Sequence, residues 1–305
     1  MGILYYYIFL VLGFLISWIY IQDRLEIKEK LLIVGCGQLG FKIGNALSKN
    51  FDVTGIKRKN ITDGVQFKIF ELDIFSERFI QTIQIINPHY IVYATAADNQ
   101  SEESYQNAYV NGLSISIKAA MACCNIKHFF FISSTRVYGQ KSDENLSEFT
   151  LPIPSDFGGI ALLEGETILR NSTVPSTILR LSGIYGNNRR SMLKLATTPE
   201  LWPENNRWTN RIHEDDAVRF LSFLLDSRNG ETSLEPLYLL TDNSPATVYE
   251  VLNWIRSKLN FPEHPINAKG GLVGKKLISK IIPELNFYFK YSDYQKGYTS
   301  IINEH

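Results

Sequence analysis

Apolar runs of strand length alternate with helix-length stretches over the first part of the chain, from Leu31 to about Leu181. The apolar runs predict strands at 31–34, 53–57, 66–72, 90–94, 129–133 and 176–181. Apolar residues at spacings of three and four predict helices at 39–49, 75–86, 105–124 and 160–170. Strands that alternate with helices are typical of repeated βαβ units, so we predict an α/β fold with a doubly wound parallel sheet.

The pattern loosens after residue 181, where glycine, asparagine and proline interrupt the apolar runs. Two helices are predicted in this half, at 214–226 and 247–259, and a late strand is predicted between them at 237–240. We therefore expect residues 30–181 to form a large domain and residues 182–305 to form a smaller C-terminal lobe.

The first 22 residues carry no charged side chain and are rich in leucine, isoleucine, phenylalanine and tyrosine. About 20 apolar residues let a helix cross the hydrocarbon layer, so residues 1–22 predict a transmembrane anchor, followed by a linker at 23–29. Basic residues follow the apolar run, which predicts a single-pass membrane protein with its main domain in the cytoplasm. A mis-chosen start codon and a helix that lies on a surface stay open as alternatives.

Charge and cysteine content narrow the class of partner. The 305 residues carry 31 basic and 31 acidic side chains. This balance gives no reason to expect nucleic acid, so the expected partner is a small molecule. The three cysteines are odd in number and two are adjacent, which favours neither a disulfide framework nor a zinc site. We therefore expect no metal.

A glycine motif, Gly-x-Gly-x-x-Gly, follows the first predicted strand. Because it joins a strand to a helix in the first βαβ unit, it is typical of a Rossmann-like, dinucleotide-binding fold. Its glycines would turn the chain, admit the pyrophosphate and let the helix pack closely. An ordinary strand-to-helix turn is the alternative. The cofactor-binding residues predicted in this loop are Gly35, Gly37, Gln38, Leu39 and Gly40.

Residues after the second predicted strand indicate which dinucleotide to expect. An NAD site would place an acidic residue there, whereas this chain has Lys57, Arg58 and Lys59. Cations suit a 2′-phosphate, so NADP is the expected cofactor, with NAD as the alternative; a solvated strand end would explain the same residues. Asp73 would meet the adenine amino group or cap a helix, and Ala94 would line the cofactor at the end of the fourth strand.

Several segments together resemble the extended short-chain dehydrogenases/reductases, which include sugar-nucleotide epimerases and dehydratases. They are the glycine loop, residues 133–139 (Ser-Ser-Thr-Arg-Val-Tyr-Gly), residues 178–186, residues 210–217 and residues 291–298. The similarity covers residues 30–298 and is greatest to an atypical, YeeZ-like subgroup. The resemblance implies that the C-terminal lobe binds the substrate, and it leaves a homodimer open.

The resemblance also implies a catalytic tyrosine, a lysine four residues later, and a serine or threonine that hydrogen-bonds the reacting oxygen. Ser134 matches the last role, but no Tyr-x-x-x-Lys occurs anywhere in the chain. Residues 154–161, where that pair would lie, contain neither tyrosine nor lysine. Tyr109 stands where the family has an active-site asparagine. The expected active site is therefore altered.

Two hypotheses follow. In the first, another acid serves, and Tyr185 leads because Arg189 and Arg190 would lower the pKa of its phenol. The remaining candidates are Tyr138 as a catalytic residue and Arg136, Arg180, Arg211 and His213 as substrate-binding residues. For His213 a structural hydrogen bond is the alternative role, and for Arg136 a surface ion pair.

The expected function under the first hypothesis is reduction, dehydration or epimerisation of a small hydroxylated substrate, for example one derived from a sugar nucleotide. Under the second hypothesis, the chain is a catalytically silent NADP(H)-binding sensor or scaffold at the membrane, because a dinucleotide site can persist for binding alone.

Overall fold

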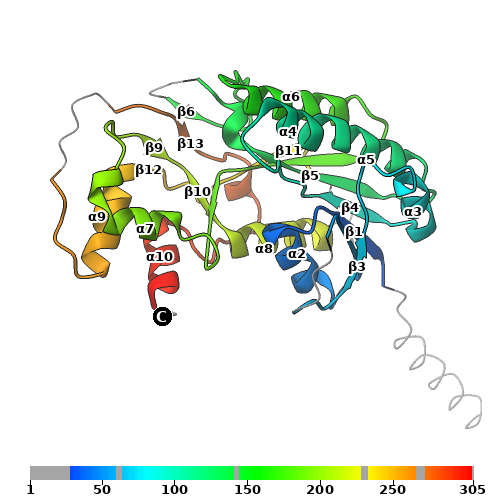
Figure 1. Cartoon of the computed structure of the whole chain (residues 1–305), viewed down its shortest axis with the longest axis horizontal. Coiled ribbons are helices and arrows are strands. Elements are labelled where there is room, and N and C mark those ends of the chain that lie inside the picture. Colours follow the sequence, from blue (N-terminus) through cyan, green and yellow to red (C-terminus); the bar gives the residue numbers. More distant parts are fainter. Residues whose placement is uncertain (1–27, 60–63, 141–143, 228–232, 266–271, 304–305) are drawn as a thin grey trace, which may run out of the picture.

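A computed structural model describes residues 28–59, 64–140, 144–227, 233–265 and 272–303. Its centre is a sheet of seven strands in the order β11-β7-β5-β4-β1-β2-β3, and every pairing in it is parallel (Figure 1). The strands are β1 Lys30–Val34, β2 Asp52–Lys57, β3 Lys68–Glu71, β4 Tyr90–Tyr93, β5 His128–Ser134, β7 Ser176–Leu181 and β11 Leu237–Leu240. The predicted α/β fold with a doubly wound parallel sheet is confirmed, together with the six predicted strands and the late strand.

Helices cover both faces of this sheet (Figure 1). The helices α2 Gln38–Leu47 and α8 Glu214–Ser227 pack on one face. The other face is covered by α3 Phe79–Ile86, α5 Gly112–Met121 and α6 Phe157–Arg170. A short helix, α4 Glu102–Gln106, continues through the π-helical turn η1 Asn107–Asn111 into α5. Because both faces are covered, the central strands are built around unbroken apolar runs, as β1 shows with four consecutive buried residues.

The strand order reverses at β1, which places the candidate site. β1 pairs with β2 on one side and with β4 on the other, so the chain leaves β1 toward one edge and later returns to the opposite edge. In doubly wound sheets, ligands bind outside the carboxyl ends of the strands at this point. The residues that follow β1, β2, β4 and β5 are therefore the ones to inspect.

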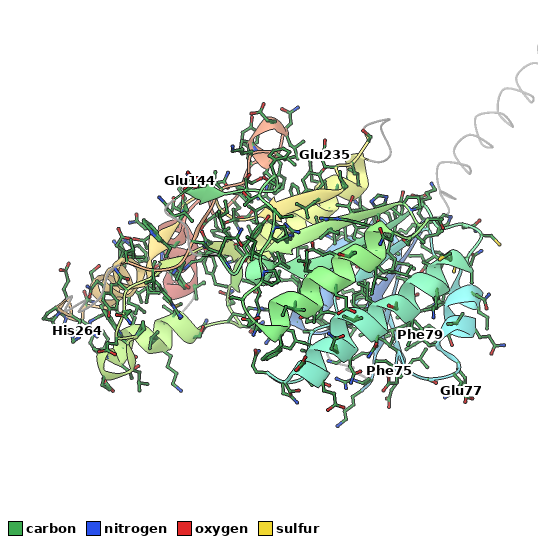
Figure 2. The ribbon with its side chains drawn as sticks, turned by 90° about the horizontal axis from the view of Figure 1, so that it is seen from above. Phe75, Glu77, Phe79, Glu144, Glu235 and His264 are labelled. Carbon is green, nitrogen blue, oxygen red and sulfur yellow. The ribbon has the colours of Figure 1, made fainter. Side chains whose placement is uncertain are left out.

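A smaller lobe is built on the carboxyl side of the sheet and lies beside it (Figure 1). It contains two short two-stranded sheets, β8 Gly183–Tyr185 with β10 Arg211–His213 and β9 Trp208–Thr209 with β12 Ala246–Thr247. Its helices are α7 Ser191–Thr197, α9 Val248–Lys258 and α10 Tyr294–Asn303, with a 3-10 turn at Pro199–Leu201. A further 3-10 turn, Ile282–Glu284, packs on β11 of the large sheet. In the view from above, His264 marks this lobe at one end of the molecule and Phe79 marks the opposite end (Figure 2).

The lobe has its own core and is tied back to the large domain. Val251, Leu252 and Ile301 pack with Tyr185 and Tyr298 in a separate apolar cluster. A further pair of short strands, β6 Asn145–Leu146 and β13 Lys276–Leu277, joins the loop after β5 to the C-terminal part of the chain. The C-terminal half therefore contributes to both parts of the molecule, since β11 belongs to the large sheet and α8 belongs to the layer that covers it.

The predicted membrane localisation needs correction. Within the described ranges, no helix has both the length and the apolar character that crossing a bilayer requires. The predicted anchor at residues 1–22 lies outside the residues that the structure describes. With no spanning helix found, the prediction of a single-pass membrane protein with a cytoplasmic main domain is not upheld.

Candidate functional site

Glycines shape the turn between β1 and α2. Gly35 has a φ of 95°, and a Cβ there would lie 2.6 Å from the backbone nitrogen of Thr95. A Cβ at Gly40 would overlap the carbonyl oxygen of Gly35 and stand 3.2 Å from the side chain of Ile33. Gly37 differs, because no described atom lies within 4 Å of the position its Cβ would take. Two glycines thus let the turn and helix close up, and the third leaves open space.

The N-terminus of α2 faces that open space. Gly37 is the N-cap and supplies no side-chain hydrogen bond, and the first turn of α2, which begins with Gln38 and Leu39, holds no acidic residue. The first N–H groups of a helix have no partner within the helix and carry a partial positive charge. The arrangement fits the pyrophosphate of a dinucleotide. Cys36, between the glycines, is buried, and burial raises the pKa of its thiol to about 12, so it acts as a packed spacer.

An ion pair crosses the sheet edge beside this loop. Arg58, just after β2, donates from Nη1 to Asp98 Oδ2 at 2.8 Å and from Nη2 to the other carboxylate oxygen. The hydrogen bond raises the pKa of Arg58 and lowers the pKa of Asp98. Both side chains are exposed. The cation that was expected to meet a 2′-phosphate therefore already holds an anion from the loop after β4.

The other residues predicted near the cofactor have local roles. Lys57 ends β2 and is half-buried. The side chain of Asp73 accepts the N–H of Phe75 at 2.9 Å and so stabilises a turn ahead of α3. Asp73 does not cap α3, because the N-cap residue of that helix is Arg78. The N–H of Ala94 donates to Val34 at 2.8 Å and so extends the sheet toward the glycine loop. The contacts described here for Asp73 and Ala94 do not require a ligand.

Ser134 lies at the carboxyl end of β5, two strands from β1. Its Oγ accepts the N–H of Arg136 at 3.2 Å and so caps the 3-10 turn Thr135–Val137. The N–H of Tyr138 donates to Thr135 at 3.1 Å, so the chain folds back within five residues. The serine hydroxyl is half-buried and is held at the edge where substrates of doubly wound folds bind.

Residues 154–161, where the resemblance implies a tyrosine and a lysine, instead begin α6. Asp156 is the N-cap and accepts the N–H of Gly159 at 2.8 Å. A side chain at Gly158 would run into Arg136, whose Cζ lies 2.5 Å from the Cβ position. Arg136 therefore fills the space beside the helix start, where a larger residue would point.

Arg136 is held by several partners. Its Nε donates to Asp156 Oδ1 at 2.9 Å, and its Nη1 donates to the phenol oxygen of Tyr105 at 2.6 Å. The guanidinium also stacks over the rings of Tyr105 and Phe157. Burial raises the pKa of Asp156, but hydrogen bonds from Gly159 and Arg136 outweigh it and hold the pKa below its usual range. The predicted substrate-binding arginine thus lies at the candidate site within a fixed polar group.

Tyr138 and Arg180 lie in a different environment, because both side chains are fully buried. Arg180 forms hydrogen bonds to Glu166 through Nε at 2.9 Å and Nη2 at 2.5 Å, and to the Tyr138 oxygen through Nη1 at 2.7 Å. Ser133 donates to the same carboxylate at 2.7 Å. Tyr138 in turn donates to the carbonyl of Ser147, and burial raises the pKa of its phenol. This closed network argues for structural roles, against the predicted roles at the substrate.

Tyr185 is also buried, in the core of the smaller lobe. Its ring packs edge-on to His213 at 5.1 Å and lies 4.7 Å from the ring of Tyr298. Burial raises the pKa of the Tyr185 phenol, which is opposite to the lowering expected from Arg189 and Arg190. Burial favours the neutral form of His213 as well and therefore lowers the pKa of its imidazole, whose Nδ1 accepts the backbone N–H of Asp215. These surroundings argue for packing roles at both positions and against the leading catalytic candidate.

Arg211 lies near an acidic residue at the junction of the two lobes. It is buried, and its Nη1 atom has no hydrogen-bond partner among the described residues. Its backbone carbonyl accepts the N–H of Asp242 at 2.8 Å, and burial raises the pKa of the Asp242 carboxyl to about 7. A direct contact of Arg211 with substrate would need this junction to open.

Three residues at the site were not singled out from the sequence. Asp98 and Asp156 hold the two arginines described above. Lys275, from the segment before β13, brings its Nζ into contact with the carbonyl oxygen of Tyr138. Burial lowers the pKa of this amine to about 8, against a smaller opposing effect of Asp156. None of the three lies in a motif, so only a contact across the fold could have identified them.

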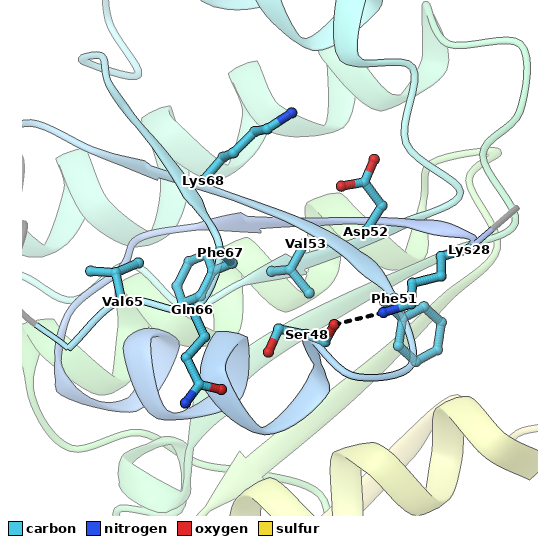
Figure 3. A pocket seen from close by; sticks show the side chains of 9 residues that line it. All are labelled: Lys28, Ser48, Phe51, Asp52, Val53, Val65, Gln66, Phe67 and Lys68. Carbon is cyan, nitrogen blue, oxygen red and sulfur yellow. Dashed lines mark hydrogen bonds between the residues drawn. The ribbon is translucent and has the colours of Figure 1, made fainter.

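A shallow pocket lies elsewhere, at the start of β2 (Figure 3). Its lining residues are Lys28, Ser48, Phe51, Asp52, Val53, Val65, Gln66, Phe67 and Lys68. Lys28 Nζ donates to the carbonyl of Ser48 at 3.1 Å across it. The pocket lies at the amino end of the strand, away from the edge where the glycine loop is found, so it is separate from the candidate site.

Comparison with known protein families matches residues 29–269 to the RmlD substrate binding domain. The chain belongs to this family. RmlD-family membership confirms the expected relation to epimerases and dehydratases, whereas the YeeZ-like subgroup has no support in the comparisons. A search of the curated proteins found no match.

Solved structures agree with the RmlD assignment. A proposed NAD-dependent epimerase/dehydratase from Methylobacillus flagellatus is 35% identical, with 90% of this chain and 98% of that chain covered and a TM-score of 0.79. UDP-glucuronic acid 4-epimerase from Bacillus cereus, in complex with NAD, shares the fold at 18% identity, with coverage of 90% and 99% and a TM-score of 0.70. The enzyme WbmG from Bordetella bronchiseptica, in complex with NAD and UDP, does so at 15% identity, with coverage of 90% and 94% and a TM-score of 0.72.

In this RmlD-family chain, the polar groups at the carboxyl edge fall into two sets. The glycine loop offers free N–H groups to an anion. Ser134, Arg136 and Asp156 lie at the ends of β5 and the start of α6, with Lys275 beside them. The first set can hold a cofactor, and the second can meet the reacting end of a substrate.

Proposed function

We propose that this RmlD-family chain binds a nicotinamide dinucleotide at the glycine loop and acts on a hydroxyl or carbonyl group of a sugar nucleotide. One observation carries the proposal: Gly37 leaves open space in front of an uncapped helix N-terminus at the point where the strand order reverses. That feature fits a pyrophosphate. The substrate class is supported by the UDP-bound and UDP-sugar-acting neighbours.

Each group in the site then has a distinct role. The bound cofactor would accept or donate a hydride. Ser134 donates a hydrogen bond to the reacting oxygen, since its hydroxyl is held at the carboxyl edge of the sheet. Arg136, fixed by Asp156, meets a negatively charged or strongly polar part of the substrate. This assigns an epimerase, dehydratase or reductase type of chemistry without a Tyr-x-x-x-Lys pair.

For the cofactor, we propose a preference for NADP(H) over NAD(H). Lys57 ends β2 and Arg58 and Lys59 follow it, so residues 57–59 offer no acidic side chain to the ribose hydroxyls. Asp98 competes with a 2′-phosphate for Arg58, because the two anions would share one guanidinium. The preference is therefore expected to be modest. The complexes of neighbouring proteins contain NAD, so both nucleotides belong in the test.

The experiment is a titration of the purified protein with NAD, NADH, NADP and NADPH, followed by assays with UDP-sugars. Binding of at least one nicotinamide nucleotide, and its weakening in Gly37→Ala, are expected. With cofactor present, change in a UDP-sugar should be visible by mass spectrometry and chromatography, and it should slow in Ser134→Ala. Failure of all four nucleotides to bind would reject the proposal. Binding without any turnover would leave the silent sensor hypothesis as the better one.

A further inference from the structure

A short segment before β13 runs between the two lobes and is fixed to both. Val273 accepts the N–H of Trp208 at 2.9 Å, and Asn210 donates from its side chain to the Lys275 carbonyl at 3.0 Å. The next residue, Lys276, pairs with Asn145 in the loop that follows β5. Lys275 therefore has a defined place at the junction between the lobes.

The Lys275 side chain extends toward the turn that carries Ser134. Its Nζ donates to the carbonyl oxygen of Tyr138, and Tyr138 closes the turn through its N–H bond to Thr135 at 3.1 Å. On the α6 side, the facing charge is Asp156, which acts on the amine through space. Serine hydroxyl, carboxylate and amine thus come from three separate parts of the chain to one edge.

The amine has little to stabilise its positive charge. The group that it contacts, a peptide carbonyl, is neutral. Asp156 is the carboxylate that faces it, and Arg136 already holds that carboxylate at 2.9 Å. Burial lowers the pKa of Lys275 to about 8, so an uncharged amine is accessible near neutral pH.

We propose that Lys275 is the catalytic residue that transfers a proton at this site, in place of the missing Tyr-x-x-x-Lys pair. The inference rests on the proposed function and deepens it. The substrate oxygen would lie between Ser134 and Lys275, with the serine hydroxyl as hydrogen-bond donor and the amine as base.

The step balances as follows for an alcohol substrate. The O–H bond breaks and its proton goes to Lys275 Nζ, which becomes an ammonium. The C–H bond breaks on the carbon that bears this oxygen, and the hydrogen would leave with its electron pair for the oxidised nicotinamide nucleotide. The products are a carbonyl compound, the reduced nucleotide and a protonated lysine; reduction runs in the opposite direction.

The first test measures the amine itself and needs no turnover. The whole protein is acetylated with acetic anhydride from pH 6 to pH 11, and the labelling of each lysine is measured by mass spectrometry. Lys275 should label with a midpoint near pH 8, well below the ~10.4 of an ordinary lysine, and saturating NADP plus UDP should protect it at least about 10-fold. Lys276 is the internal control. A midpoint near 10.4, or labelling that ligands leave unchanged, would overturn the proposal.

The second test separates proton transfer from positive charge. Lys275→Arg keeps the charge and the length but cannot release a proton, so it should slow turnover by about 100-fold or more and leave nucleotide affinity unchanged. Lys275→Met should match it, and Lys276→Met should behave as wild type. Activity retained in Lys275→Arg would show that only charge is needed and would refute the assignment.

Failure of the proposed function would look different from failure of this inference. If wild type binds no nicotinamide nucleotide, or binds one and turns over no UDP-sugar, the proposed function fails, and the catalytic role of Lys275 fails with it whatever the labelling shows. If wild type turns over and both Lys275 variants do as well, only the inference about the lysine is wrong.

Discussion

Replacing Gly37 by alanine should weaken dinucleotide binding while leaving the fold intact. No described atom lies within 4 Å of the new Cβ, and the backbone at this position is extended, so the free energy of unfolding should change by less than about 0.5 kcal/mol. The methyl group would stand where the pyrophosphate approaches the helix N-terminus. Loss of one charge-assisted hydrogen bond there costs about 1.5–3 kcal/mol, which is a rise in Kd of about 10- to 150-fold.

Gly40→Ala is the matched comparison. Its Cβ would overlap the carbonyl oxygen of Gly35, so α2 must move by on the order of 1 Å, and the overpacking should cost about 1–3 kcal/mol of stability. Urea unfolding and calorimetric titration with NAD and NADP measure both quantities for each variant. The argument is refuted if Gly37→Ala binds both nucleotides as wild type does, or if it unfolds as easily as Gly40→Ala.

Three other outcomes are expected. Asp98→Asn should tighten NADP binding about 3- to 10-fold without changing NAD binding, because it removes the anion that competes for the guanidinium; equal changes for both would contradict this. Glu166→Gln should lower the free energy of unfolding by about 3 kcal/mol, because Arg180 stays buried without its anion, whereas Glu164→Gln on the exposed side of the helix should have almost no effect in the same urea titrations. Burial raises the pKa of Asp242 to about 7 from about 3.9 in the unfolded chain, so the folded state binds the extra proton between these values. Stability should therefore fall by up to about 1.4 kcal/mol per pH unit from pH 4 to pH 7, and Asp242→Asn should remove that slope; a slope of opposite sign would disprove the assignment.

The secondary structure of the large domain could be predicted from the sequence because the signal is local. A strand buried on both faces needs an unbroken apolar run, as Leu31 to Val34 provide, and a covering helix needs apolar residues on one side, as in α2. The seventh strand at 237–240 was also visible as an apolar run. The pattern could not show that this strand pairs in the large sheet and that α8 covers one face of it, although both elements lie in the C-terminal half of the sequence.

The candidate site was predictable only in part. Gly35, Gly37 and Gly40 could be assigned by spacing, because the backbone geometry that they allow is a property of those residues alone. Tyr185 and Arg180 were read from their motifs as site residues, but both side chains are enclosed in packed cores. Burial depends on what the rest of the chain places around a residue, which no motif contains.

The amino-acid sequence by itself therefore determined the parallel α/β architecture, the glycine loop between β1 and α2, and the absence of a Tyr-x-x-x-Lys pair. Only the tertiary structure decided which charged groups meet at the site. Asp98 lies 40 residues from Arg58, and Lys275 lies 137 residues from the carbonyl that it contacts. Local preferences reach a few residues along the chain, whereas a pKa or an ion pair depends on distance through space, so these contacts had to come from the fold.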